Sequence, residues 1–273
     1  YVDALEKDMR LANYSRRSVA VYRSNVIRFL KAYENQYSEP KAIPAEAIKD
    51  FILSLYSSSH MVQMHASITK LYTRIIGQPK KTANIPIARQ ESKDPVVLDK
   101  REVMAILFTI TNLKHKAMIT VLYSSGVRLG ELLNLKITDI DSTRMLINVR
   151  QGKGAKDRQT LLAPEALTLL RKYWKECRPK EYLFEGLKGG RYSETSVEKI
   201  IKKASAVARI SKVVTAHTFR HSFATHLHEA GNDIRVIQML LGHKNSKTTE
   251  LYTRLSTRHL SAVISPLHGM MAS

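Results

Sequence analysis

The chain has 273 residues, and its 44 lysines and arginines against 24 aspartates and glutamates give a formal net charge of +20. At roughly 100–200 residues per domain, this length predicts two domains. The 44% of apolar and 25% of charged residues are typical of globular proteins and argue against intrinsic disorder. We find no apolar run long enough for a membrane span and no signal peptide. The single cysteine, Cys177, excludes an internal disulfide framework and favours a cytoplasmic protein.

The positive charge is spread over the whole sequence. Residues 1–90 carry 14 basic and 7 acidic groups, and residues 91–273 carry 30 and 17, so both parts are basic. Two basic surfaces suit a polyanion held between them, because each neutralised phosphate releases counterions. The charge therefore favours a nucleic-acid ligand, with a merely soluble protein of high pI as the alternative. The first residue is Tyr1 rather than methionine, which leaves open whether a further segment precedes it.

Residues 1–77 have the pattern of a helical domain. Ser15 is placed to cap a helix whose apolar residues recur on one face. Two more helices are expected over Ala45–Tyr56 and His60–Ile76, and Gly77 is expected to end the second.

A linker is predicted over residues 78–96, where three prolines and a pair of lysines interrupt the periodicity. The second domain, 97–273, opens on Asp99 with Glu102 three residues later, which is the pattern of a capping box. A helix over Lys114–Ser124 follows and ends near Gly126.

The pattern then changes to two short strands, Met145–Val149 and Arg158–Leu162, which predict a hairpin with a basic tip. An amphipathic tail, Arg258–Ile264, comes near the end of the chain. The fold class is therefore mainly α with a small β-sheet. Further helices are expected between hairpin and tail, at about 164–176, 195–208, 217–230, 233–241 and 246–254.

Two short stretches combine basic residues with glycine. Arg128 begins a helix after Gly126, and Glu131 lies on the same side of it, where a carboxylate can orient the guanidinium. Lys153 lies at the hairpin tip between two glycines, without the spacing of a nucleotide-binding loop. A surface ion pair and a solvated turn are the ordinary alternatives.

A third stretch is the helix that contains His217 and His221. At about 100° per residue its apolar side chains share one sector and its imidazoles share another, with Arg220 near the boundary. A metal on the two histidines is the alternative, although a third ligand is not evident and the arginine would repel a cation. We therefore expect no metal. The apolar sector consists of Phe219, Phe223, Leu227 and Ala230.

The fourth stretch follows this helix in the sequence. Gly242 is expected to end a helix and to release His243 from it, and Tyr252 follows nine residues later. A lone tyrosine is usually a packing residue, so Tyr252 gains weight only from its place in the series.

Together these residues occur in the order that resembles the tyrosine recombinases, the family of phage integrases and Xer recombinases. The resemblance extends over essentially the whole chain, with Ala216 and Arg254 as departures that touch no expected catalytic group. It implies a C-shaped, two-domain DNA clamp, with a helical core-binding (SAM-like) domain over 1–77 and an α+β catalytic domain over 97–273. The six active-site positions of the family correspond to Arg128, Lys153, His217, Arg220, His243 and Tyr252.

The resemblance implies an enzyme that cleaves and rejoins DNA without a cofactor, metal or ATP. Tyr252 would form a 3′-phosphotyrosine bond, Arg128 and Arg220 would hold the phosphate with His243, Lys153 would protonate the leaving oxygen, and His217 would act as base or orient the tyrosine. Glu131 would support Arg128. A homotetramer would exchange strands through a Holliday junction for integration, excision or resolution, with accessory proteins as an option and the tail packed in cis or trans.

The DNA-binding candidates are basic side chains of both domains, each of which could equally be a solvated charge. A non-catalytic DNA-binding protein, a type IB topoisomerase-like enzyme and an interaction scaffold are the competing hypotheses. The candidates are Arg16, Arg17, Arg23, Lys70, Arg74, Lys156 and Arg158.

Overall fold

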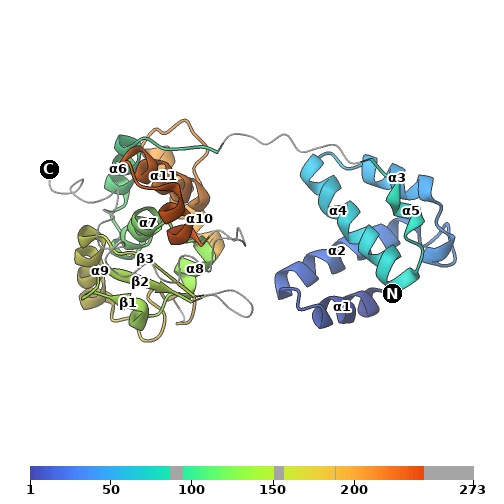
Figure 1. Cartoon of the computed structure of the whole chain (residues 1–273), viewed down its shortest axis with the longest axis horizontal. Coiled ribbons are helices and arrows are strands. Elements are labelled where there is room, and N and C mark those ends of the chain that lie inside the picture. Colours follow the sequence, from blue (N-terminus) through green and yellow to red (C-terminus); the bar gives the residue numbers. More distant parts are fainter. Residues whose placement is uncertain (87–94, 151–156, 188, 243–273) are drawn as a thin grey trace. The chain divides into compact units, whose positions relative to one another are not determined.

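The computed structural model describes residues 1–86, 95–150, 157–187 and 189–242. It divides the chain into two compact units, Tyr1–Lys93 and Asp94–Ser273, and each is described by itself (Figure 1). The helix expected at about 246–254 and the tail Arg258–Ile264 lie outside the described residues.

The first unit is helical, as predicted. Ser15 caps α2, because its Oγ accepts a hydrogen bond from the Ser18 backbone N–H at 3.1 Å. Gly77 ends the last long helix in the left-handed conformation, at φ +78°. The elements are α1 (Val2–Leu11), α2 (Arg16–Tyr33), a 3₁₀ turn (Pro40–Ala42), α3 (Ala45–Leu53), α4 (Ser58–Lys70), a π-helical continuation (Leu71–Ile76) and α5 (Lys80–Ala83).

The core of this unit is apolar and rich in aromatic rings. Phe29 of α2 is fully buried, and its ring packs edge-on against Phe51 and Tyr72. Asn25 and Ser67 form a polar pair inside the core, and the amide donates to the hydroxyl at 3.0 Å. Since the donor has a partner, this pair avoids the cost of an unsatisfied buried polar group.

A short helix lies near the start of the stretch 78–96, which the sequence predicts as a linker. Residues 80–83 form α5, which packs against α3 and α4 and buries Thr82. Lys81 donates from its Nζ to the Ile43 carbonyl at 2.7 Å. Pro79 is the N-cap of α5, and proline begins helices as readily as it breaks them. Residues 80–83 therefore belong to the first unit.

The second unit combines helices with a three-stranded antiparallel sheet in the order β1-β2-β3. The capping box at Asp99 and Glu102 is confirmed, while the two-residue strand β1 was not predicted. The elements are α6 (Lys100–Thr109), α7 (Leu113–Ser125), α8 (Leu129–Asn134), a 3₁₀ turn (Ile137–Asp139), β1 (Ile140–Asp141), β2 (Leu146–Val149), β3 (Arg158–Leu161), α9 (Pro164–Cys177), α10 (Glu194–Val207), α11 (Ala216–Glu229) and α12 (Ile234–Leu241).

Helix α7 lies in the middle of this unit, between α9, α11 and the sheet (Figure 1). Every residue from 117 to 125 is buried, which explains why the helix is apolar or small on all sides. α7 ends at Gly126, whose φ is +62°. A Cβ at this position would collide with the ring of Phe223, so the turn requires glycine for its conformation and for space.

The sheet connects to these helices through strand β3. Arg158 and Thr160 are two residues apart and therefore lie on the same face of the strand. Thr160 donates from its hydroxyl to the Ser125 carbonyl at the end of α7, at 2.6 Å. In the register of the sheet, Arg158 lies opposite Val149 of β2.

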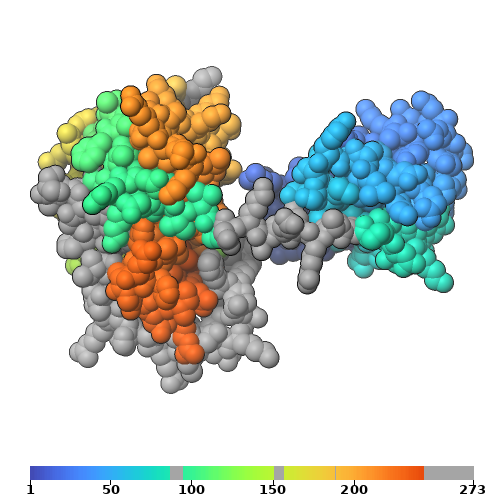
Figure 2. Space-filling model, turned by 90° about the horizontal axis from the view of Figure 1, so that it is seen from above, coloured from blue at the N-terminus to red at the C-terminus, as the bar shows by residue number. Residues whose placement is uncertain are grey.

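A smaller apolar cluster holds α11 and α12 against the sheet. Phe219, Phe223 and Leu227 are buried as predicted, but Ala230 is exposed because α11 ends at Glu229. α12 buries one face, with Ile237, Leu240 and Leu241, and exposes the other, including Ile234; part of this segment is visible at the surface in red-orange (Figure 2). The cluster is Leu146, Leu161, Phe223, Leu227, Ile237, Leu240 and Leu241.

The start of the second unit is bound to α11. The Leu98 backbone N–H donates to the Ser222 hydroxyl at 2.9 Å, and this hydroxyl donates to the Thr218 carbonyl.

None of the described helices is long and apolar enough to cross a membrane.

Candidate active site

Arg128 is held at the first turn of α8 by Glu131, as the sequence predicted for their spacing. The Glu131 carboxylate accepts from the Arg128 backbone N–H and from its Nη1, each at 2.8 Å. The Arg128 side chain remains 42% exposed, so its guanidinium is oriented by the protein and still reaches solvent. An oriented guanidinium of this kind is suited to a phosphate or carboxylate ligand.

Glu131 also binds a second arginine that the sequence assigned elsewhere. Arg158 donates from Nη1 and Nη2 to the two carboxylate oxygens of Glu131, at 2.9 and 2.7 Å. Burial alone would raise the pKa of Glu131, but the hydrogen bonds from Arg158 and Arg128 and the charge of Arg158 lower this pKa to about 2. The carboxylate is therefore ionised at any physiological pH.

Arg220 of α11 is the most deeply buried of these arginines, with its side chain 3% exposed. It donates from Nη1 to the Gly126 carbonyl at 2.7 Å and from Nη2 to the Leu241 carbonyl at 2.5 Å. Burial, together with the nearby charges of Arg128 and Arg158, lowers its pKa to about 10. Arg220 therefore remains cationic at neutral pH.

The three arginines meet at the C-terminal end of α12. The carbonyls of three consecutive residues accept from Arg158 (2.8 Å), Arg220 (2.5 Å) and Arg128 (3.5 Å) in turn. The last carbonyls of a helix have no partner within it and carry partial negative charge, so cations are favoured there. With Glu131 the cluster has a net charge of +2, which favours an anion as its ligand. The three carbonyls belong to Leu240, Leu241 and Gly242.

His217 and His221 lie one turn apart on α11, with ring centroids 4.3 Å apart in an edge-to-face arrangement. Burial lowers the pKa of both imidazoles, and the neighbouring charge of Arg220 lowers both further. His221 also disfavours a positive charge on His217. A neutral imidazole at pH 7 can accept a proton. Among the described residues, no group of three or more His, Cys, Asp or Glu side chains is arranged to hold a metal ion.

Four of the predicted site residues lie outside the described residues: Lys153, Lys156, His243 and Tyr252. The structure describes four other predicted site residues and brings them together from α8, with its N-cap, and from α11. They are Arg128, Glu131, His217 and Arg220.

Arg158 departs from its predicted place in an exposed DNA-contacting set. Its side chain is 8% exposed, and three of its N–H donors bind Glu131 and Leu240. The sequence signal for this inward position is the spacing of Arg158 two residues before Thr160, which places both side chains on the strand face that meets α7.

The DNA-binding candidates of the first unit lie on α2, on α4 and on the segment after it. Arg23 forms an ion pair with Glu6 at 3.3 Å, and Arg74 pairs with Asp8 at 3.0 Å. Lys70 contacts the ring and the hydroxyl of Tyr14. Arg16 and Arg17 are exposed in the first turn of α2. The contacts of Arg23, Arg74 and Lys70 lie at the solvent-exposed surface, where such interactions are weak and can be exchanged for a ligand.

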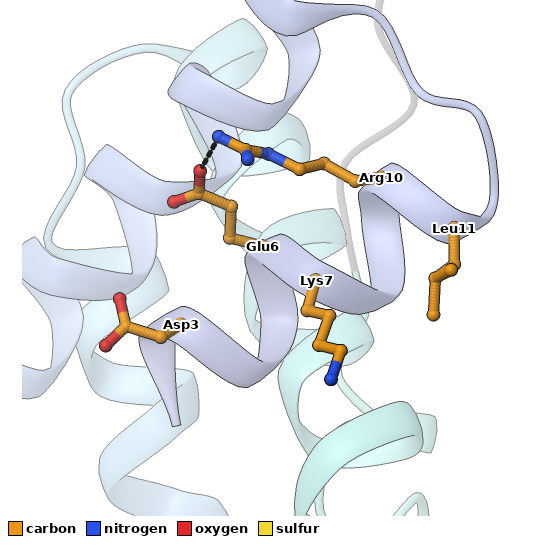
Figure 3. A pocket seen from close by; sticks show the side chains of 5 residues that line it. All are labelled: Asp3, Glu6, Lys7, Arg10 and Leu11. Atoms are coloured by element: carbon orange, nitrogen blue, oxygen red, sulfur yellow. Dashed lines mark hydrogen bonds and ion pairs between the residues drawn. The ribbon is translucent and has the colours of Figure 1, made fainter.

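A surface hollow of about 460 Å³ runs along α1, and Figure 3 shows its lining. All its lining residues come from this one helix, and the acidic Glu6 turns toward Arg10 in an ion pair. A hollow lined by a single helix does not converge polar groups on a ligand, so we assign it no function.

Comparisons with known proteins agree on one family. The model of the phage integrase family matches residues 96–259. A protein of Sinorhizobium fredii described as a putative integrase/recombinase is 36% identical over 269 residues, which cover 96% of this chain and 86% of that protein. Tyrosine recombinase XerC 2 of Ralstonia nicotianae is 31% identical over 296 residues, with 98% and 85% covered.

Solved structures extend this similarity to the fold. A crystal structure of XerA recombinase matches with a TM-score of 0.54 at 31% identity, and covers 96% of this chain and 95% of that one. XerH recombinase bound to its palindromic difH substrate matches with a TM-score of 0.72 at 22% identity, with 96% and 83% covered. The mainly helical fold with a small sheet is therefore shared with these recombinases.

Proposed function

Because this chain belongs to the phage integrase family and is a site-specific tyrosine recombinase acting on double-stranded DNA, we propose that its arginine cluster holds the phosphate that is cleaved. One observation carries this assignment. Arg128 and Arg220 come from different helices, and both reach the C-terminal end of α12, immediately before His243 in the sequence.

The chemistry divides among the six residues of the family pattern. The phenol oxygen of Tyr252 attacks phosphorus while Arg128 and Arg220 hold the non-bridging oxygens, and His243 adds a hydrogen bond. The 5′ oxygen leaves with a proton from Lys153, which gives a 3′-phosphotyrosine bond and a free 5′-hydroxyl. This bond retains the free energy of the phosphodiester, so a second 5′-hydroxyl can reverse the reaction without ATP.

His217 is assigned the proton of the nucleophile. The phenol of an unperturbed tyrosine has a pKa of about 10, so at neutral pH it needs a base or a positive environment to react. The lowered pKa of His217 keeps its imidazole neutral and able to accept this proton. In this proposal His217 would supply the base, and the arginine cluster would supply the positive environment.

We assign binding of the DNA backbone to basic side chains of both units. Arg16, Arg17, Arg23, Lys70 and Arg74 on the first unit and Lys156 on the second would contact phosphates. Phosphate contacts set the position of the protein, whereas contacts to base edges select the site. Arg158 is left out of this set because its guanidinium is committed to Glu131.

We place the enzyme in the cytoplasm, where it would act on its DNA sites as a homotetramer that exchanges strands through a Holliday junction, with or without accessory proteins. A topoisomerase of similar chemistry would act on one duplex alone. Incubation with two marked sites separates these functions, because exchange joins the flanks of different sites and relaxation does not.

The proposal is tested with a nicked DNA substrate that releases a short strand on cleavage and thereby traps the covalent product. The wild-type protein is expected to form an adduct that survives denaturation, and Tyr252→Phe is expected to form none. Tyr56→Phe is the matched control, since Tyr56 is an exposed residue of the first unit. An adduct formed equally by Tyr252→Phe would remove the assigned nucleophile.

A further inference from the structure

Arg158 joins three elements that are distant in the sequence. From β3 it donates to both carboxylate oxygens of Glu131 in α8, at 2.9 and 2.7 Å, and from its Nε to the Leu240 carbonyl of α12, at 2.8 Å. A guanidinium has five N–H donors in one plane, and three of them are used here in fixed directions. The geometry therefore fixes the sheet, the first turn of α8 and the end of α12 relative to one another.

The contact with α12 includes the turn that ends the helix. Gly242 is left-handed, at φ +64°, and a Cβ there would lie 2.8 Å from the Arg158 Cδ and 3.0 Å from its Nε. The side chain of Arg158 thus fills the space beside the last described residue. A substitution that changes the shape of this side chain would therefore change the packing at Gly242, where α12 ends.

The two arginines bound to Glu131 differ in what they can do. The Arg158 side chain is 8% exposed and bound through both ends of its fork, whereas that of Arg128 is 42% exposed and reaches the Gly242 carbonyl at 3.5 Å, a long contact. Arg158 is therefore the fixed partner of the carboxylate. Arg128 is the partner that can turn from a carbonyl to a ligand while Glu131 keeps its position.

We propose that Arg158 is a positioning residue for DNA cleavage: it fixes Glu131 and the C-terminal end of α12, so that Arg128 and Arg220 are held at the separation a phosphate requires. It does not contact DNA itself. This inference rests on the proposed function, because it assigns Arg158 a task in that same site.

The first test separates positioning from binding. Adduct formation on nicked DNA is measured in a single turnover at saturating DNA, together with DNA affinity at several salt concentrations. Arg158→Met is expected to lose about 10²-fold in rate, the effect of a misplacement of about 1 Å. Its affinity and salt slope should equal those of the wild type. Arg150→Met is the matched control: Arg150 follows Val149, the partner of Arg158 in the sheet, but its side chain is 64% exposed and paired with Asp139.

The second test uses the carboxylate as the reporter. Without the fork of Arg158, Glu131 loses two hydrogen bonds that keep it ionised, so its pKa rises. The cleavage rate of Arg158→Met should therefore fall more steeply than that of the wild type between pH 7 and pH 5. Arg158→Lys keeps the charge but donates in fewer directions, so its rate and acid sensitivity should lie between the two.

The outcomes are distinguishable. If the wild type forms no adduct, the proposed function fails. If the wild type reacts and the Arg158 variants react equally fast, the positioning role fails alone. A salt slope reduced by about one with an unchanged rate would make Arg158 a phosphate contact. Should Arg158→Met not fold, as shown by thermal unfolding, Arg158→Lys decides through its pH profile, which does not depend on the amount of folded protein.

Discussion

The two units of this protein carry similar kinds of basic residue and place them differently. In the first unit Arg23 and Arg74 lie at the surface in exposed ion pairs, and the core beneath them is apolar and aromatic. In the second unit the side chains of Arg158 and Arg220 are 8% and 3% exposed. Arg158 binds a carboxylate that is itself 11% exposed, and both arginines bind backbone carbonyls at helix ends.

This difference indicates two uses of positive charge. An exposed pair is weak and is readily exchanged for a phosphate, which suits a surface that holds DNA at many points. A buried charge is costly unless every partner is in place, so such a cluster has one geometry. In the proposed function, the first arrangement would provide affinity for DNA, and the second would provide the fixed geometry that a reacting phosphate needs.

The largest expected effect tests whether the two cores are independent. Phe29→Ala should lower the free energy of unfolding of the first unit by about 3–5 kcal/mol, because a fully buried ring is removed. Trp174, the only tryptophan of the chain, lies on α9 and reports the second unit. In a denaturant titration, circular dichroism should show the first unit unfolding at a lower denaturant concentration than in the wild type. The midpoint of the unfolding transition followed by Trp174 fluorescence should not change. An equal shift of both would mean that the units unfold as one.

The next effect concerns the buried arginine of the site. Arg220→Ala should reduce the rate of adduct formation at saturating DNA by about 10²–10³-fold, the usual loss of one stabilising donor. Arg220→Lys should not restore it, since an ammonium cannot reproduce the planar fork that reaches Gly126 and Leu241. Arg74→Ala in the first unit is the control. If its rate at saturation falls equally, the two kinds of arginine are not distinct in function.

Acid should affect the second unit through Glu131. Its folded pKa of about 2 lies below the ordinary value of 4.5, so its stabilising contribution is present above about pH 4.5 and is lost as the pH falls toward 2. The difference corresponds to about 3 kcal/mol at most. Unfolding followed by Trp174 fluorescence should show a smaller loss of stability over this range in Glu131→Gln than in the wild type. Identical acid sensitivity would mean that the carboxylate is not held as described.

The smallest effect belongs to a single surface charge. Arg16→Ala should reduce the slope of log affinity against log salt by about 0.9 if Arg16 binds a phosphate, with little effect on the cleavage rate at saturation. Lys31→Ala is the control, because Lys31 is exposed at the other end of α2 and is not assigned to DNA. A slope that does not change would remove Arg16 from the DNA-binding set.

The local parts of the fold could be predicted because their signals lie within a few residues. The Ser15 cap, the Asp99–Glu102 capping box and the turn at Gly126 each depend on side chains close in sequence. The pairing of Arg128 with Glu131 has the same origin, since residues three apart on a helix are neighbours.

The remaining features depend on contacts between distant residues. The sequence does not predict α5, because only its packing on α3 and α4 makes a four-residue helix stable. The basic hairpin predicts a DNA contact for Arg158, because its partners Glu131 and Leu240 are 27 and 82 residues away in the sequence. The helical pattern places Arg220 only at the edge of an apolar face, because its burial depends on the ends of α7 and α12.

Gly126 has a consequence for sequence variation and engineering. Its φ of +62° disfavours every other L-amino acid, a Cβ would displace the ring of Phe223, and its carbonyl accepts the Arg220 guanidinium. At Gly77, by contrast, φ is +78° and a Cβ would meet no other atom within 4 Å, so asparagine can replace it at modest cost. A library randomised at both positions and selected for recombination should return glycine alone at 126 and a mixture at 77.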